Sequence, residues 1–174
     1  GTGAVDQNSL MGNTFPGACV PFGLVQLSPD VKSKPTGHEP SGYDYSSNRI
    51  YGFSHTHLSG TGCVDLLDVL VMPSSRSLDE LSKTDDFSST FSHTNEKASV
   101  GYYAVKLDED GINAEMTATL RTGMHRYTYA AGKASNLVFD MAHSGHWTRN
   151  ISDAQLRLID PYTLAGYRIL DGWQ

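Results

Sequence analysis

Apolar and polar residues alternate in steps of two along much of the chain, most clearly over residues 112–120. One face of this stretch carries Ile112, Ala114, Met116, Ala118 and Leu120. Because successive side chains of a β-strand point to opposite faces, the pattern predicts a half-buried strand. Residues 102–107 precede it across the polar turn 108–111, so the two runs predict a β-hairpin.

Further short apolar runs predict more strands, which Gly, Pro and Asp residues separate. They lie at residues 22–27, 51–58, 66–72, 124–129, 136–141, 154–159 and 163–169. Ser28, Pro29 and Asp30 are expected to end the first run, and Pro73 the third. A helical pattern extends over a single turn, residues 78–81. Many short strands at this spacing indicate one all-β domain, an antiparallel β-sandwich built largely as a meander.

The charge balance and the apolar run lengths exclude two classes of partner. The chain has 13 Lys and Arg residues against 19 Asp and Glu, and the basic residues are scattered. We therefore expect no nucleic acid partner. No segment approaches the roughly 20 apolar residues of a membrane-spanning helix, so no membrane span is expected. The two cysteines, Cys19 and Cys63, could pair or both be free, and they are too few to define a disulfide framework.

Histidine, hydroxyl and carboxylate side chains are most concentrated at residues 52–65. If residues 51–58 are extended, His55 and His57 point to the same face, together with Phe53. The residues that follow are Ser59, Gly60, Thr61 and Gly62. Glycine packs little and favours turns or close backbone approach, so the stretch predicts a strand that runs into a binding loop.

Three interpretations of the histidine pair stay open on spacing alone. His55 and His57 could ligate zinc, with Asp65 or His93 completing the site. They could instead exchange hydrogen bonds with a polyhydroxylated ligand. The structural alternative is two histidines hydrogen-bonded within a loop. Two ligands do not close a tetrahedral zinc site, so the pair by itself favours the structural alternative.

Aromatic side chains supply further binding candidates. Trp147 and Trp173 could each stack on a sugar face or fill the core of a sandwich. Tyr43 and Tyr45 would share a face if their segment is extended. In each case binding and packing are equally compatible with the sequence.

The sequence assigns no catalytic residue. It contains no Gly-x-Ser-x-Gly elbow, no phosphate-binding loop and no dinucleotide glycine fingerprint. The carboxylate pairs Asp65/Asp68 and Asp108/Asp110 lie in an expected strand and an expected hairpin turn. Neither placement identifies a general acid or base.

A series of motifs in order resembles the N-terminal β-sandwich domain of glycoside hydrolase family 92, the exo-acting α-mannosidases. The family's opening signature resembles residues 13–18, 20–23 and 26–30 of this chain. Its most distinctive signature resembles residues 50–62. The match continues at residues 91–93, 95–99, 101–103, 117–119, 121 and 125–127. The resemblance therefore runs nearly from end to end.

The resemblance implies a galactose-mutarotase-like supersandwich packed against a larger α/α toroid, with a mannose pocket between them and a bound Ca²⁺. Hydrolysis with inversion of the anomeric centre needs a general acid and a general base. In the family both carboxylates come from the helical domain, so the resemblance assigns no catalytic residue to this chain. The resemblance assigns part of the substrate pocket to Phe15, His55, His57, Ser59, Gly60, Thr61 and Gly62.

Residues 1–174 are accordingly expected to be an incomplete N-terminal sandwich of a secreted or periplasmic enzyme, inactive without the helical domain. The expected partners are mannose-containing glycans and that domain. Two alternatives belong to other classes of protein: a free-standing carbohydrate-binding module, and a purely structural sandwich that docks a neighbour.

Overall fold

The fold was analysed in a computed structural model that describes residues 2–3, 13–31, 40–63, 65–144 and 151–171. Trp147 and Trp173, considered above as sugar-stacking residues, lie outside the described residues. No helix among the described residues is long and apolar enough to cross a membrane.

The described chain forms three antiparallel sheets. The largest has the order β1-β2-β3-β4-β10, with β5 pairing to β3. Its strands are β1 (Ala18–Cys19), β2 (Gln26–Val31), β3 (Arg49–Ser54), β4 (Leu70–Ser74), β5 (Ser89–Thr90) and β10 (Asn136–Asp140). The second sheet is a meander of β6 (Lys97–Ser99), β7 (Tyr102–Leu107), β8 (Ile112–Ala118) and β9 (Gly123–Thr128). The third is a hairpin of β11 (Ile151–Asp160) and β12 (Thr163–Leu170).

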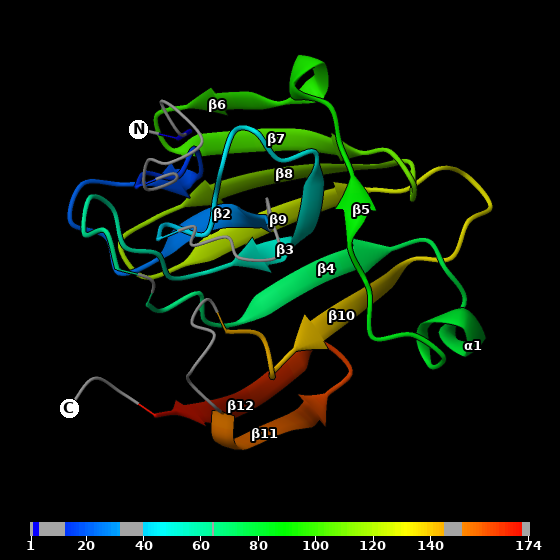
Figure 1. The fold of residues 1–174 in the computed structure, drawn as a ribbon. Coiled ribbons are helices and arrows are strands. Elements are labelled where there is room, and N and C mark those ends of the chain that lie inside the picture. Colours follow the sequence, from blue (N-terminus) through cyan, green and yellow to red (C-terminus); the bar gives the residue numbers. More distant parts are fainter. Residues whose placement is uncertain (1, 4–12, 32–39, 64, 145–150, 172–174) are drawn as a thin grey trace.

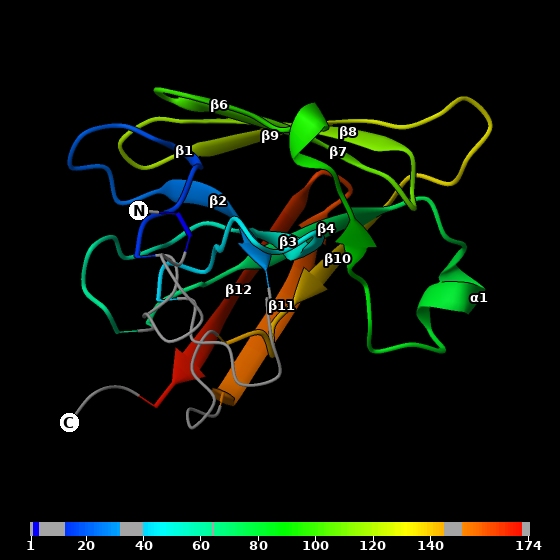
Figure 2. The same cartoon turned by 45° about the horizontal axis from the view of Figure 1, so that its top comes forward.

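The two larger sheets form two layers that face each other, as Figure 2 shows. Leu27, Ile50, Phe53 and Met72 from the first layer pack with side chains of the second in a single core. The second layer contributes Tyr103, Val105, Leu107, Ile112, Ala114 and Met116. Burial of each large apolar side chain contributes about 1.5–3 kcal/mol. The antiparallel β-sandwich expected from the sequence is confirmed, whereas its continuation beyond this chain stays a prediction.

The hairpin of β7 and β8 confirms the alternating pattern. Ile112, Ala114, Met116 and Ala118 are buried, and their neighbours Asn113 and Thr117 are exposed. The strand ends at Ala118 instead of residue 120, because the Thr119 N–H donates to the Thr122 carbonyl and closes a turn there. The short helical turn is confirmed as α1 (Leu78–Leu81), which begins with a capping box between Ser77 and Glu80.

The prediction that residues 28–30 end a strand is wrong, because β2 continues to Val31. The Gln26 N–H donates to the His55 carbonyl next to β3, so the backbone N of Pro29, three positions on, faces the opposite edge. There β1 pairs only Ala18 and Cys19 and does not reach Pro29. A missing N–H donor is tolerated at such an edge position. β4 likewise continues through Pro73, which pairs with Leu137 of β10.

Two further strand boundaries differ from the prediction. β3 ends at Ser54 and not at residue 58. β4 begins at Leu70 and not at residue 66, because Leu66, Leu67 and Val69 have φ angles of 66°, 59° and 58°. These left-handed conformations cannot belong to a strand. The segment between the two strands is therefore a long loop.

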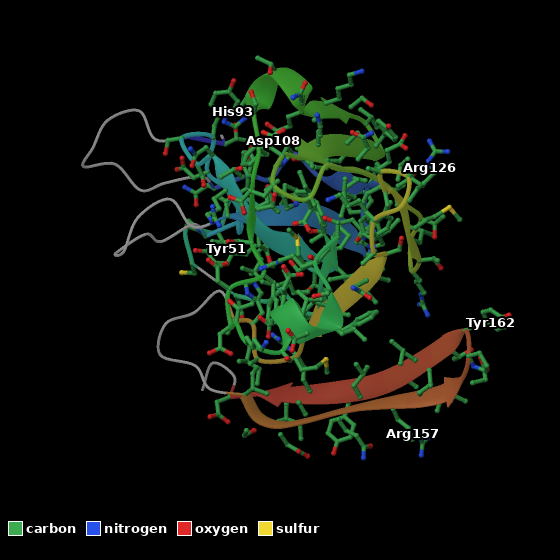
Figure 3. All side chains as sticks on the ribbon, turned by 90° about the vertical axis from the view of Figure 1, so that its right-hand side faces the viewer. Tyr51, His93, Asp108, Arg126, Arg157 and Tyr162 are labelled. Carbon is green, nitrogen blue, oxygen red and sulfur yellow. The ribbon has the colours of Figure 1, made fainter. Side chains whose placement is uncertain are left out.

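The expected strands near the end of the chain are present as the hairpin of β11 and β12. Figure 3 shows it beside the sandwich, with Tyr162 at its turn and Arg157 pointing away from the layers. Most of its side chains are exposed, including Leu158 and Leu164. β1, β5 and η1 (His93–Asn95) were not predicted, because two or three residues are too short for a periodic pattern.

Candidate functional site

The loop between β3 and β4 folds back on itself through its first and last residues. The His55 N–H donates to the Asp68 carbonyl at 2.9 Å, and the Leu67 N–H donates to the Thr56 carbonyl at 3.0 Å. The Thr56 hydroxyl donates to Asp68 Oδ2 at 3.0 Å and accepts from the Asp68 N–H, also at 3.0 Å. These bonds hold the left-handed residues near Asp68 in place, and such strained backbone is often found at functional sites.

His57 lies beneath this loop with a fully buried side chain. Its Nδ1 is 2.6 Å from the Gln26 carbonyl oxygen, which can only accept, so Nδ1 donates. Its Nε2 is 2.9 Å from Oδ1 of Asp30, which also accepts when the carboxyl is ionised. Nε2 also lies 3.2 Å from the Ser54 hydroxyl, so both ring nitrogens are hydrogen-bonded within the protein. The Phe15 ring lies 5.0 Å from the His57 ring, so the structure brings these two predicted residues together.

Asp30 accepts a second imidazole at its other oxygen, where His143 Nε2 lies 2.9 Å from Oδ2. Burial alone would raise the pKa of Asp30, but the hydrogen bonds and charges of His143 and His57 lower it to about 2. Asp30 is thus a buried carboxylate at neutral pH. The backbone of Gly42 approaches it so closely, at a φ of 80°, that a Cβ there would lie 2.6 Å from Oδ1. A side chain at position 42 would displace the carboxylate.

The network extends from Asp30 to the β12 strand. The Arg168 guanidinium donates to the His143 carbonyl through Nη1, and to Asp68 Oδ1 through Nε at 3.0 Å. We call Asp30, His57, His143, Arg168 and Asp68 the Asp30 network. It joins β2, the segment after β10, β12 and both ends of the β3–β4 loop, so it fixes how that loop sits on the sandwich.

His55 points to a different set of partners. Its Nδ1 is 2.7 Å from the Val69 carbonyl oxygen and must donate, which leaves Nε2 of the neutral ring as an acceptor. His125 Nε2 lies 3.0 Å from that atom and therefore donates to it. His125 Nδ1 then accepts from the Tyr127 hydroxyl at 2.7 Å. The partners thus assign one tautomer to each ring along the chain Tyr127, His125, His55.

Burial keeps both of these imidazoles neutral. It lowers the pKa of His55. Burial and the nearby His55 charge lower the pKa of His125 to about 4. The prediction that His55 and His57 face the same way depended on an extended strand through residue 58, and β3 ends at Ser54. One imidazole therefore joins the Asp30 network and the other joins His125.

The exposed part of the loop is its tip. Ser59, Gly60 and Thr61 are exposed, whereas Gly62 is partly buried. The Gly60 N–H donates to the Asn13 carbonyl at 2.6 Å, which holds the tip against the segment that leads into the Phe15 turn. The structure therefore brings the two predicted site segments together, with hydroxyl groups at the surface and His57 and Phe15 beneath.

The structure does not assemble the zinc site considered above. His93 Nδ1 lies 2.6 Å from Glu96 Oε2, and its ring stacks on Tyr45 at 4.0 Å. Tyr43 is buried and donates to the same Glu96, while Tyr45 is exposed, so the two tyrosines do not share a face. Among the described residues, no three or more His, Cys, Asp or Glu side chains are grouped to hold a metal ion. Cys19 and Cys63 are free.

Three residues of the site were not identified from the sequence: Asp30, His125 and Arg168. Asp30 was assigned to a turn, although it lies in β2, next to the last residue of the strand. Its partner His143 is 113 positions away, and His125 is 70 positions from His55. A local pattern cannot identify such pairs. The one available signal was the concentration of histidines at strand ends.

The whole chain, residues 1–174, matches the family model of the glycosyl hydrolase family 92 N-terminal domain. A structure of the family GH92 alpha-mannosidase BT3965 from Bacteroides thetaiotaomicron is 39% identical with a TM-score of 0.84, covering 94% of this chain and 22% of that one. The structure of the same enzyme in complex with mannoimidazole is 38% identical with a TM-score of 0.83, covering 93% of this chain and 22% of that one. The structure of the GH92 family glycosyl hydrolase ccman5 is 31% identical with a TM-score of 0.72, covering 95% of this chain and 23% of that one.

A curated relative is a secreted glycosidase of Arthroderma benhamiae. It is 29% identical over 130 residues, which are 72% of this chain and 16% of that protein. The chain therefore spans less than a quarter of the length of each of these relatives.

Proposed function

We propose that this chain, which belongs to the glycosyl hydrolase family 92 N-terminal domain family, forms one wall of the sugar pocket of an exo-α-mannosidase. The full-length enzyme hydrolyses terminal α-mannose from glycans with inversion and depends on Ca²⁺. The observation that supports this proposal is the exposed hydroxyl-bearing loop tip, held rigidly on the sandwich by the Asp30 network.

The loop tip provides groups that suit a polyol. The Ser59 and Thr61 side chains are exposed, and a hydroxyl group can both donate and accept hydrogen bonds. Thr61 Oγ1 donates to the Cys63 carbonyl at 3.0 Å and accepts from the Cys63 N–H at 3.3 Å, which fixes the orientation of the hydroxyl and leaves one lone pair for a ligand. A binding group that is already oriented loses little freedom when the sugar binds.

The remaining predicted residues support the tip. His57 and Phe15 pack beneath it, and both ring nitrogens of His57 are hydrogen-bonded within the protein. We assign both to positioning of the loop. His55 is partly buried and lies at the loop's first turn, where its ring orients the backbone of Val69. We place it at the edge of the pocket together with Gly60 and Gly62.

Other groups come from a second, helical domain of the longer protein. Inverting hydrolysis requires an acid and a base whose carboxyl groups are about 6.5–9.5 Å apart, with a water between them. We also assign the Ca²⁺ ligands to that domain. Among the described residues, no three or more acidic, His or Cys side chains are grouped to hold a metal ion. Bound Ca²⁺ would polarise and hold sugar hydroxyls. Like the relative from Arthroderma benhamiae, the enzyme is secreted, or it is periplasmic.

The test uses the full-length enzyme and an α-mannobiose substrate. Ser59→Ala and Thr61→Val are expected to lower kcat/KM about 3- to 10-fold each, the effect of one neutral hydrogen bond. Ser82→Ala, on an exposed hydroxyl at α1, is the matched control and should leave kcat/KM unchanged. A full-length protein without α-mannosidase activity would refute the proposal. Tight mannose binding by the isolated sandwich would instead support a free-standing carbohydrate-binding module.

A further inference from the structure

Arg168 is a buried charge on an otherwise exposed hairpin, which Figure 1 shows beside β10. Its neighbours Tyr167 and Ile169 are exposed, whereas the Arg168 side chain is only 5% exposed. Ala165, the cross-strand partner of Arg157, is three positions before Arg168, so the two arginine side chains point to opposite faces of the hairpin. Arg157 points away from the sandwich (Figure 3), and Arg168 therefore points towards it.

The Arg168 guanidinium contacts two segments of the sandwich. Its Nε donates to Asp68 Oδ1 at 3.0 Å, and its Nη2 lies 2.8 Å from the same oxygen. Its Nη1 donates to the His143 carbonyl. Burial of a charge is costly unless the group is paired and hydrogen-bonded, and these contacts provide both. A lysine ammonium is a single point charge and lacks the planar fork that reaches both segments.

The backbone around Asp68 is strained. Leu66, Leu67 and Val69 lie on either side of it at left-handed φ angles of 66°, 59° and 58°. Left-handed backbone is unfavourable for residues with a Cβ, and it persists only where the surrounding structure holds it. The end of the β3–β4 loop therefore depends on its contacts for its conformation.

Asp68 connects Arg168 to the start of the same loop. While Oδ1 faces Arg168, Oδ2 accepts from the Thr56 hydroxyl at 3.0 Å. The Asp68 backbone bonds to Thr56 Oγ1 and to the His55 N–H. These last bonds join the two ends of the loop to each other, so they move with it. The Arg168 contact comes from outside the loop, and it holds the closed loop in one place on the protein.

We propose that Arg168 is a positioning residue for sugar binding, which acts through Asp68 on the β3–β4 loop and so sets the affinity of the loop tip for the substrate. The inference rests on the proposed function. A loop that leaves its place presents the tip hydroxyl groups to the sugar in only a fraction of the molecules, and the apparent affinity falls by that fraction. The loss affects the ground state and the transition state alike. The hairpin thus contributes to the pocket without contacting the sugar.

The test uses the full-length enzyme and steady-state kinetics with α-mannobiose. Arg168→Met removes the charge and keeps most of the side-chain volume. We expect KM to rise by about 3- to 30-fold with kcat unchanged, the range in which residues act on binding through other residues. Arg157→Met, on the opposite face of the same hairpin, is the matched control and should change neither constant. An unchanged KM for Arg168→Met, or an equal rise for Arg157→Met, overturns the proposal.

A second comparison separates positioning from a loss of stability. Destabilisation lowers the fraction of active enzyme, so it decreases the apparent kcat and leaves KM unchanged. Asp68→Asn should raise KM as Arg168→Met does, and the double variant should show no further rise, because one residue acts through the other. Rises that multiply would contradict this order. If Arg168→Met does not fold, Arg168→Lys keeps the charge without the fork and must still raise KM.

Hydrogen exchange followed by mass spectrometry gives a readout that needs no activity. Arg168→Met should accelerate exchange at the His55 and Leu67 N–H groups, whose bonds close the loop, and leave exchange in β8 unchanged. Equal acceleration in β8 reports global destabilisation and overturns the positioning role. A wild-type enzyme without α-mannosidase activity refutes the proposed function, while the exchange comparison still decides whether Arg168 positions the loop.

Discussion

The Asp30 network makes a quantitative prediction for Asp30→Asn. The substitution keeps the shape of the side chain and removes its charge, so no cavity forms. The pKa of Asp30 falls from 3.8 to about 2 in the folded protein, a difference of about 1.8 units. At 1.36 kcal/mol per unit, ionised Asp30 stabilises the fold by about 2 kcal/mol. Asp30→Asn should lower the free energy of unfolding by about that amount at pH 7.

The pH dependence tests the same reasoning independently. Because folding lowers the pKa of Asp30, the stabilisation is complete above pH 3.8 and is lost as the pH falls through about 2. Urea unfolding of wild type and Asp30→Asn should therefore show a difference in free energy that is constant from pH 7 to 5 and shrinks towards pH 3. Asp85→Asn, at an exposed carboxylate, should stay within about 0.5 kcal/mol of wild type. A difference below 0.5 kcal/mol for Asp30→Asn at pH 7 would refute the charge assignment.

Two further predictions concern the loop and its histidines. Folding lowers the pKa of His125 from 6.5 to about 4. The neutral ring therefore stabilises the fold above pH 6.5, and this stabilisation is lost as the pH falls towards 4. An NMR titration in which the His125 ring protonates near pH 6.5 would contradict the tautomer chain. Val69→Gly relieves a left-handed β-branched residue and should raise the free energy of unfolding by roughly 0.5–1 kcal/mol. Val100→Gly, at an exposed position without positive φ, is the urea-unfolding control and should lower it or leave it unchanged.

The hydrogen-bond partners of His57 illustrate why the sequence predicted only part of the site. The sequence placed His55 and His57 beside a glycine-rich loop, and that loop and its contact with the Phe15 turn are present. The partners of each imidazole depend on where β3 ends and on residues far along the chain. Asp30 is 27 positions from His57, and His143 is 113 positions from Asp30. No local pattern specifies which carboxylate meets which ring.

The sequence by itself determined the strands in which burial follows side-chain type, such as β8, and the single turn of α1, whose capping residues are adjacent in the chain. It also determined the family, because the motifs occur in order. The tertiary structure decided that β2 passes Pro29 and that residues 66, 67 and 69 are left-handed. It also decided the hydrogen-bond partners of His57 and the left-handed conformation of Phe22. These features depend on neighbours brought together by folding, since backbone pairing and buried charges are satisfied by groups distant in sequence.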